Sequence, residues 1–290
     1  MNPRTLQRVI EAIPTSDGAG VKLRRSLGQS AWARLDPFLM LDHFSTDNAD
    51  DYIAGFPAHP HRGFETVTYM LDGHMRHQDH LGNVGELKSG GVQWMTAGRG
   101  IIHSEMPQQD AGRMRGFQLW INLPAAEKMK PAGYRDIQAN EIPVVMLPGG
   151  ARVKVIAGTL DVNGAITPGP IQGLATDPLY LDIELPAGVT LTHPIKAGYH
   201  AFVYPFEGSI TVGPAKAART LESHHAGVLA DGDTVELAGG GGEGGRALLL
   251  AGRPLLEPIV QYGPFVMNSR EEIEQAMSDY QRGALTEAHP

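Results

Sequence analysis

The 290-residue sequence contains no cysteine, which excludes disulfide bonds, thiolate metal sites and cysteine nucleophiles. It also lacks an apolar run of membrane-spanning length, and the segment Met1–Ser16 has no signal-peptide core. We therefore expect a cytoplasmic protein. Basic residues are in the minority, and the formal net charge of −8 argues against direct binding to nucleic acid, which requires a basic face to displace phosphate counterions.

What is present favours a folded protein made of strands. The hydrophobic content of 42% is enough for a core, while 36 glycines and 21 prolines favour tight turns. Short apolar or alternating runs recur, each closed by Gly, Pro, Asn or Asp. These predicted strands are 66–71, 91–95, 117–123, 152–156, 179–185, 201–206 and 247–251. The pattern predicts an all-β barrel or sandwich.

A degenerate internal repeat divides the chain. The segment Tyr69–Gly73 resembles Tyr204–Gly208 at an offset of 135 residues, and Leu87–Met95 resembles Leu229–Leu237 at an offset of 142. Two copies of one small barrel, the second with a longer hairpin, explain both offsets. We expect a first barrel over residues 1–135, a linker over 136–148 and a second barrel with a terminal helix over 149–290.

The terminal helix has a clear start and stop. Ser269 and Glu272 have the spacing of a capping box, and Gly283 is placed to end the helix. Between them, apolar residues at helical spacing fall on one predicted face: Ile273, Ala276, Met277 and Tyr280. We expect this face to pack on a barrel.

Two short motifs supply candidate metal ligands. His59 and His61 are two residues apart, so in an extended segment their side chains point to the same face. Glu65 has the same parity. Downstream, His103 and Glu105 repeat the spacing, after glycines that suit a tight turn.

Facing each other across a barrel, the two motifs would provide three imidazoles and a carboxylate. An isolated His-x-His pair is common by chance, and the second pair makes the pattern specific. A donor set of nitrogen and oxygen suits Fe(II), Mn, Ni, Cu, Co or Zn better than Ca or Mg. Parity leaves both Glu65 and Glu105 open as the carboxylate.

The motifs resemble those of the cupin superfamily, and the whole chain is similar to pirin, a family with two cupin barrels. The matching stretches cover nearly all of the sequence: 36–43, 59–69, 93–103, 119–124 and 257–268. The resemblance implies a double-stranded β-helix (jelly-roll) fold for each barrel. It also implies an iron(II) held by four residues: His59, His61, His103 and Glu105.

The resemblance leaves a role for Glu65 and predicts a second barrel without metal. Many cupins use the glutamate of the first motif, here Glu65, as a ligand; otherwise we expect it to orient an imidazole. At the two repeat offsets, the candidate ligands of the first barrel become residues that form no ligand set: Pro194, Lys196, His200, Gly245 and Ala247.

The resemblance to bacterial pirins implies a dioxygenase that cleaves flavonols such as quercetin with O2. The metal would act as a Lewis acid on the enolic hydroxyl, and Glu105 or Glu65 would accept its proton. The alternative is a regulatory binding protein that responds to metal or redox state, as eukaryotic pirins do, with a protein partner that the sequence does not identify.

Other residues near the motifs have simpler interpretations. His74, His77 and His80 are three residues apart and do not share a strand face, so we interpret them as part of a polar hairpin. His77 could still line the mouth of a pocket. Three large side chains could form an apolar wall for a flat substrate: Phe56, Met70 and Trp94.

Overall fold

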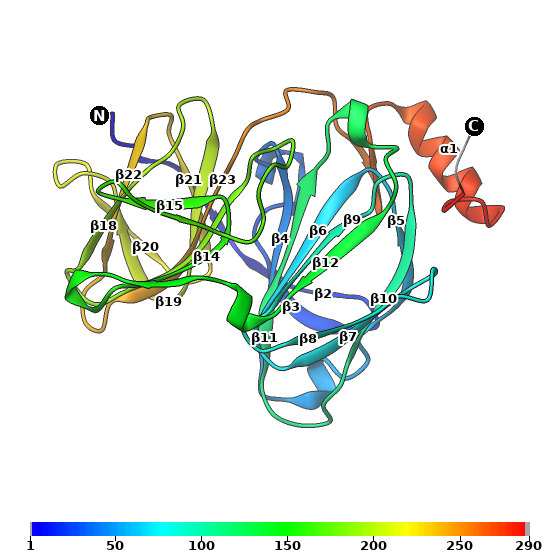
Figure 1. The fold of residues 1–290 in the computed structure, drawn as a ribbon, viewed down its shortest axis with the longest axis horizontal. Coiled ribbons are helices and arrows are strands. Elements are labelled where there is room, and N and C mark those ends of the chain that lie inside the picture. Colours follow the sequence, from blue (N-terminus) through cyan, green and yellow to red (C-terminus); the bar gives the residue numbers. More distant parts are fainter. Residues whose placement is uncertain (1, 288–290) are drawn as a thin grey trace. The chain divides into compact units, whose positions relative to one another are not determined.

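The structure is a computed structural model that describes residues 2–287 and contains two compact units (Figure 1). The first unit comprises the chain up to Ile13, Gln29–Pro37 and Asn140–Pro254, and the second comprises Pro14–Gly28, Phe38–Ala139 and the chain from Leu255. The predicted ranges 1–135 and 149–290 are continuous, whereas each unit is assembled from separate segments. Residue 1 and residues 288–290 of those ranges lie outside the described residues.

The second unit contains two larger sheets and one ladder. The seven-stranded sheet has the order β12 (Gly133–Ile137), β9 (Val92–Thr96), β6 (Phe64–Asp72), β11 (Met114–Asn122), β4 (Phe38–Thr46), β3 (Val21–Arg25) and β2 (Ile13–Asp17). The four-stranded sheet has the order β5 (Phe56–His61), β10 (Ile101–Pro107), β7 (His74–Asp79) and β8 (Val84–Lys88). The ladder pairs β24 (Val260–Tyr262) with β25 (Phe265–Met267). Helix α1 (Arg270–Gln281) completes the unit.

The first unit repeats this plan. Its main path has the order β1 (Leu6–Glu11), β21 (His225–Leu229), β19 (His200–Val212), β23 (Gly245–Gly252), β17 (Leu179–Leu185), β14 (Arg152–Ala157) and β13 (Val144–Met146). Three more strands pair off this path: β18 (Thr190–Pro194), β20 (Arg219–Glu222) and β22 (Thr234–Gly239). A separate ladder joins β15 (Thr159–Val162) to β16 (Ala165–Pro168). Across both units, short 3-10 turns lie at Ala31–Ala33, Ala49–Asp51, Ala125–Glu127, Ala139–Glu141 and Pro148–Gly150.

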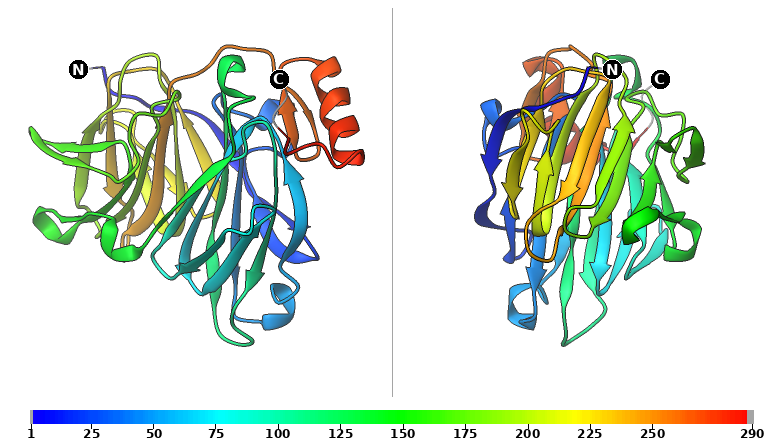
Figure 2. Two further views of the ribbon diagram at one scale, coloured as in Figure 1. Left: turned by 45° about the vertical axis from the view of Figure 1, so that its right-hand side comes forward. Right: turned by 90° about the vertical axis from the view of Figure 1, so that its left-hand side faces the viewer.

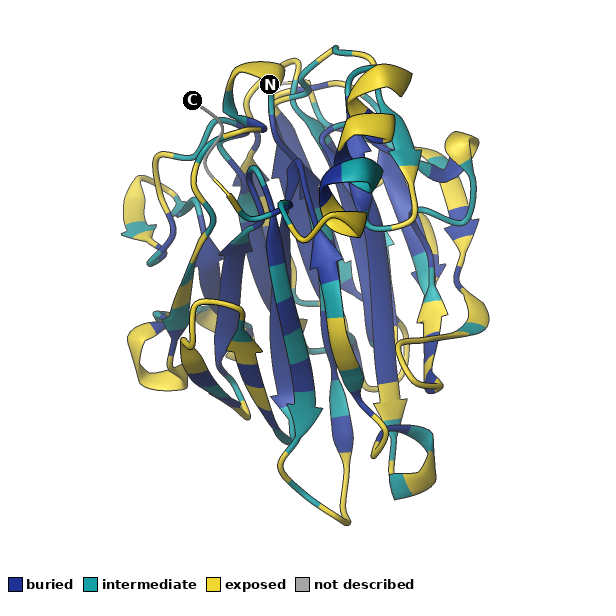
Figure 3. Ribbon diagram, turned by 90° about the vertical axis from the view of Figure 1, so that its right-hand side faces the viewer, coloured by how far each residue is buried: buried dark blue, intermediate teal, exposed yellow. Residues whose placement is uncertain are grey.

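The predicted fold class is confirmed. Each of the seven predicted strands overlaps a strand of the structure, and each unit is built of antiparallel sheets. In the second unit the long strand β6 lies between β9 and β11. In the first unit the long strand β19 lies between β21 and β23 in the same way. The strands are largely buried, whereas loops are exposed (Figure 3). Within the described residues, no helix is both long enough and apolar enough to cross a membrane.

Strand pairing corrects the register of the predicted repeat. In the second unit β10 pairs with β5, and in the first unit β22 pairs with β18 in the same way. In the β5–β10 ladder His59 lies opposite His103. The offset of 142 had matched His103 with Gly245, which lies on β23, the equivalent of β11. The equivalent β18–β22 ladder contains a single histidine, His193, which lies opposite Val235.

The predicted helix is confirmed, and it belongs to the second unit, which holds the predicted first barrel. The Ser269 side chain accepts from the Glu272 backbone N–H, and the Glu272 carboxylate accepts from the Ser269 backbone N–H. The buried residues Ile273 and Ala276 pack in one core cluster with two residues of β25 and with Leu285. The helix lies beside the C-terminal strands (Figure 2). The predicted face included Tyr280, but this side chain is 41% exposed. The neighbouring residue Asp279 is buried instead.

Buried polar contacts hold this C-terminal segment within the second unit. Arg62 and Asp279, both almost fully buried, form an ion pair with an Nη1–Oδ2 distance of 2.8 Å. The ammonium of Lys128 donates to the Gly63 and Val266 carbonyls at 2.7 and 3.0 Å. Both contacts involve the turn between β5 and β6, so the terminal segment stabilises the strand that carries His59 and His61.

Candidate metal centre

Two antiparallel strands bring the predicted histidines together. His59 and His61 share one face of β5, and His103 on β10 lies directly opposite His59. The register shifts between His103 and Glu105, where Glu105 lies opposite Phe56. This bulge adds a residue to β5 beside the candidate site, a location where bulges commonly redirect side chains.

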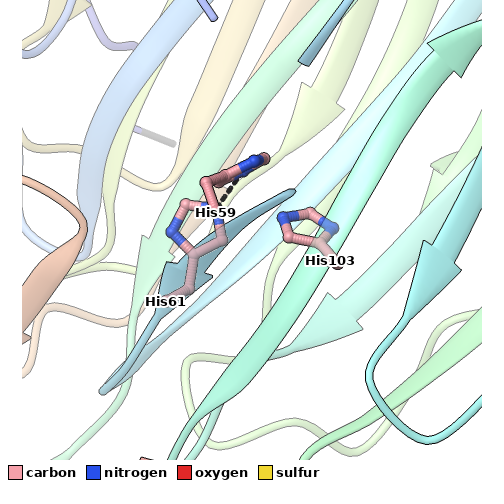
Figure 4. A group of neighbouring side chains, drawn as sticks. All are labelled: His59, His61 and His103. Carbon is pink, nitrogen blue, oxygen red and sulfur yellow. Dashed lines mark hydrogen bonds between the residues drawn. The ribbon is translucent and has the colours of Figure 1, made fainter. Parts of the chain in front are cut away.

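The three imidazoles converge on one point (Figure 4). Their candidate ligand atoms all lie within 4.8 Å of one another, and Nε2 of His59 is 3.0 Å from Nε2 of His61. Nδ1 of His59 donates to the Pro57 carbonyl at 2.8 Å, which leaves its Nε2 with a lone pair. Nε2 of His103 is buried without a hydrogen-bond partner among the described residues. This unpaired buried nitrogen fits a cluster that shares a metal ion.

Burial keeps two of these imidazoles neutral. Loss of solvent, with a smaller contribution from the neighbouring histidines, holds the pKa of His61 and of His103 well below the usual value. Neutral imidazole is the form that binds metals, because protonation removes the donor lone pair. The site is therefore ready to bind a metal at neutral pH without first losing a proton from these two residues.

Glu105 is buried near the histidines, and a donor serves each of its oxygens. Oε1 accepts from the Thr68 hydroxyl at 3.0 Å, and Oε2 accepts from the Gln118 amide at 3.3 Å. Thr68 on β6 and Gln118 on β11 are cross-strand partners, which places both donors on one row of the sheet. Glu105 lies outside the 4.8 Å group formed by the histidines. Its orientation is fixed by the sheet that faces β10.

Glu65 lies elsewhere, in contacts that differ from the predicted ones. Its carboxylate accepts from the Thr96 hydroxyl at 2.6 Å and from the Trp94 indole at 3.2 Å, and burial raises its pKa. It contacts no imidazole through these bonds. The parity with His61 fails because the chain turns at 62–63 and continues in a different sheet. A shared parity is informative only within one continuous strand.

His77 is the residue that sequence reasoning underestimated. It is 2% exposed, and its Nδ1 lies 3.2 Å from Nδ1 of His103. His74, on the same strand, instead binds Glu86 at 2.6 Å near the surface. The signal was the alternation of β7, in which Met75 and His77 are buried while their neighbours are not.

A cavity of about 590 Å³ opens beside the histidines, within the size range of small-molecule sites. Side chains of both sheets line it, including His59, His61 and Glu105. Its apolar wall comes from Leu23, Leu39, Met40, Phe44, Phe56 and Trp120. Of the three predicted wall residues, Phe56 lines the cavity. Met70 packs in a core cluster and Trp94 binds Glu65, and neither is among the described residues that line the cavity.

Comparisons with known proteins identify relatives along the whole chain. The family model described as Pirin matches residues 20–121, and the model described as Pirin C-terminal cupin domain matches residues 180–286. A protein of Pseudomonas aeruginosa, provisionally named a quercetin 2,3-dioxygenase, is 56% identical over 272 residues, which is 94% of each chain. A pirin-like protein of Caulobacter vibrioides is 50% identical, covering 98% of this chain and 99% of its own.

A solved structure supports the same relationship. The crystal structure of a quercetin 2,3-dioxygenase from Acinetobacter baumannii matches with a TM-score of 0.85 and 32% identity, covering 98% of each chain. The likeness therefore extends over both barrels.

Proposed function

The chain belongs to the pirin family, and from that premise we propose that it is a metal-dependent dioxygenase that cleaves flavonols such as quercetin with O2. The observation that carries the proposal is the group of three converging histidines, of which His61 and His103 are buried, beside a largely apolar cavity of about 590 Å³. A cavity of this size favours turnover of a small molecule over the alternative of a purely regulatory role. The relatives named for quercetin dioxygenation support the same substrate class.

We assign the metal to His59, His61 and His103, with Glu105 as the fourth ligand. The resident metal in this proposal is Fe(II), although the donor set also suits Mn, Ni, Cu, Co and Zn. When bound, the metal supplies Lewis acidity toward the enolic hydroxyl of the substrate and the redox chemistry with O2.

The protein side chains perform the remaining tasks. The Glu105 carboxylate accepts the proton of the enolic hydroxyl, and its bonds to Thr68 and Gln118 fix the accepting oxygens. Phe56 and Trp120 contribute apolar surface for the flat rings and exclude water. Glu65 takes no part, because its carboxylate is bound by Thr96 and Trp94 away from the cavity.

The overall reaction balances without another reductant or oxidant. Both atoms of O2 enter the ring-opened product, and the ring carbon that carries the hydroxyl leaves as carbon monoxide. Carbon monoxide release therefore distinguishes this reaction from simple autoxidation that only bleaches the substrate.

The test is turnover by the iron-loaded protein with a flavonol under air. We expect loss of flavonol absorbance, uptake of one O2 per flavonol and release of one carbon monoxide. A His61→Ala protein should lose metal and turnover together, whereas His74→Ala, altered near the surface, should keep both. Fully metal-loaded wild-type protein that is inert would refute the dioxygenase proposal. Full metal content in His61→Ala would refute the site.

A further inference from the structure

A buried contact between two imidazoles lies just outside the histidine cluster. His77 and His103 are each 2% exposed, and their Nδ1 atoms are 3.2 Å apart. Their ring centroids are 4.8 Å apart at an interplanar angle of 46°. The distance is that of a hydrogen bond, and a bond between two nitrogens requires that one donates and the other accepts.

The two ways of placing that proton have opposite consequences. If Nδ1–H of His103 donates, Nε2 of His103 carries a lone pair beside His59 and His61. If Nδ1–H of His77 donates, neutral His103 carries its proton on Nε2, which blocks that lone pair. Nε2 of His103 has no hydrogen-bond partner among the described residues, so no other contact there selects the tautomer.

We propose that His77 is a positioning residue that accepts the Nδ1 proton of His103 and thereby keeps Nε2 of His103 free to bind a metal. The inference rests on the proposed metal site, because the free lone pair has a use only if a metal is bound there. His77 itself binds neither metal nor substrate in this scheme. Metal-binding histidines generally depend on such an acceptor at their second nitrogen.

The fold holds His77 rigidly enough for this role. It lies opposite Glu105 in the β7–β10 ladder and is therefore a diagonal neighbour of His103, which lies opposite Asp79. Its ring is also covered by Tyr134, with a centroid distance of 5.1 Å. The same strand provides a matched control, because His74 forms its bond with Glu86 near the surface.

The first test measures the zinc(II) affinity of the metal-free protein by competition with a chromophoric chelator. His77→Leu removes the acceptor and should weaken zinc binding about 10- to 100-fold. His77→Asn keeps an acceptor, Oδ1, close to the position of Nδ1, and should remain within about threefold of wild type because the bond to His103 is retained. His74→Ala should bind zinc like wild type. Wild-type affinity in His77→Leu, or an Asn variant as weak as the Leu variant, would overturn the proposal.

The second test reads the tautomer directly from histidine nitrogen NMR spectra of the metal-free protein. We expect His103 to carry its proton on Nδ1 in wild type and to lose this preference in His77→Leu. Thermal unfolding of each metal-free variant shows whether the fold is retained. A wild-type His103 protonated on Nε2 would contradict the role of His77. A wild-type protein that binds no zinc would refute the metal site instead, so the two failures are distinguishable.

Discussion

At the scale of single residues, the carboxylate of Glu105 depends on donors from the opposite sheet. Thr68→Val removes one donor while conserving shape. Because hydrogen bonds to charged groups contribute about 1.5–3 kcal/mol, we expect flavonol turnover to fall about tenfold or more. Steady-state kcat at equal metal content measures this effect. Thr66→Val, two residues away on the same strand, is the control, and an equal loss there would show that Glu105 is not the cause.

The buried histidines also predict how stability depends on pH. Burial lowers the pKa of His61 and His103 in the folded state, so below pH 6.5 the unfolded chain binds more protons than the folded protein. Stability from these two groups is complete above that pH and is lost as the pH falls, by at most about 2.7 kcal/mol per pH unit. Urea unfolding of the metal-free protein between pH 7 and 5 measures the slope.

The control for this pH dependence is a double variant, His61→Gln with His103→Gln. We expect a shallower slope, because two groups that bind protons only in the unfolded chain are gone. Equal slopes for wild type and variant would show that both imidazoles are protonated in the folded protein, contrary to their burial.

The sequence predicts the histidines of the cluster because a spacing of two residues places side chains on the same face of a single strand. His59 and His61 need only an extended backbone to converge, and His103 follows once two strands pair. Glu65 and His77 depend on information of another kind. The turn at 62–63 sends Glu65 into another sheet, and His77 reaches His103 only because β7 pairs with β10. Which strands become neighbours is a long-range property that local spacing does not contain.

At the scale of elements, helix α1 is anchored by one buried ion pair. Asp279→Ala would leave the guanidinium of Arg62 buried without its partner carboxylate, which typically costs about 3–5 kcal/mol. We expect a loss of that size in the free energy of unfolding, measured with urea. Glu274→Ala, on the exposed face of the same helix, should change stability by less than about 0.5 kcal/mol. Comparable losses in both variants would show that the ion pair is not the anchor.

The helix shows what an amphipathic pattern can and cannot predict. The capping box and the apolar spacing fix where α1 begins and which residues turn inward, and the structure confirms Ile273 and Ala276 as buried. The pattern does not say which barrel receives that face. It also misses Asp279, because a charged residue becomes a core residue only when a partner such as Arg62 is supplied by a distant segment.

At the scale of the whole molecule, both compact units need both halves of the sequence. Strand β1 pairs with β21 in the first unit, which holds the predicted second barrel. Strands β24 and β25 and helix α1 belong to the second unit, which holds the histidine cluster. A split at the linker would therefore separate each barrel from one of its own strands or segments. The repeat in the sequence predicts two barrels, but it does not mark this exchange of chain ends.

The exchange makes a direct prediction about fragments. Residues 14–139 contain all the proposed ligands, yet they lack the carbonyl of Val266 that Lys128 binds and the carboxylate of Asp279 that Arg62 binds. We expect this fragment to be largely unfolded by circular dichroism and to bind zinc at least 100-fold more weakly than the full chain, because folding and metal binding are coupled.

Joining residues 255–290 to the end of this fragment through a flexible Gly/Ser linker restores the missing contacts. We expect the joined fragment to recover a strand-rich spectrum and zinc affinity within about tenfold of the full chain, because its compact unit is then complete. The same joined fragment carrying Asp279→Ala is the control and should recover less. If residues 14–139 alone fold and bind zinc like the full chain, the C-terminal segment is an accessory to the barrel and not part of it.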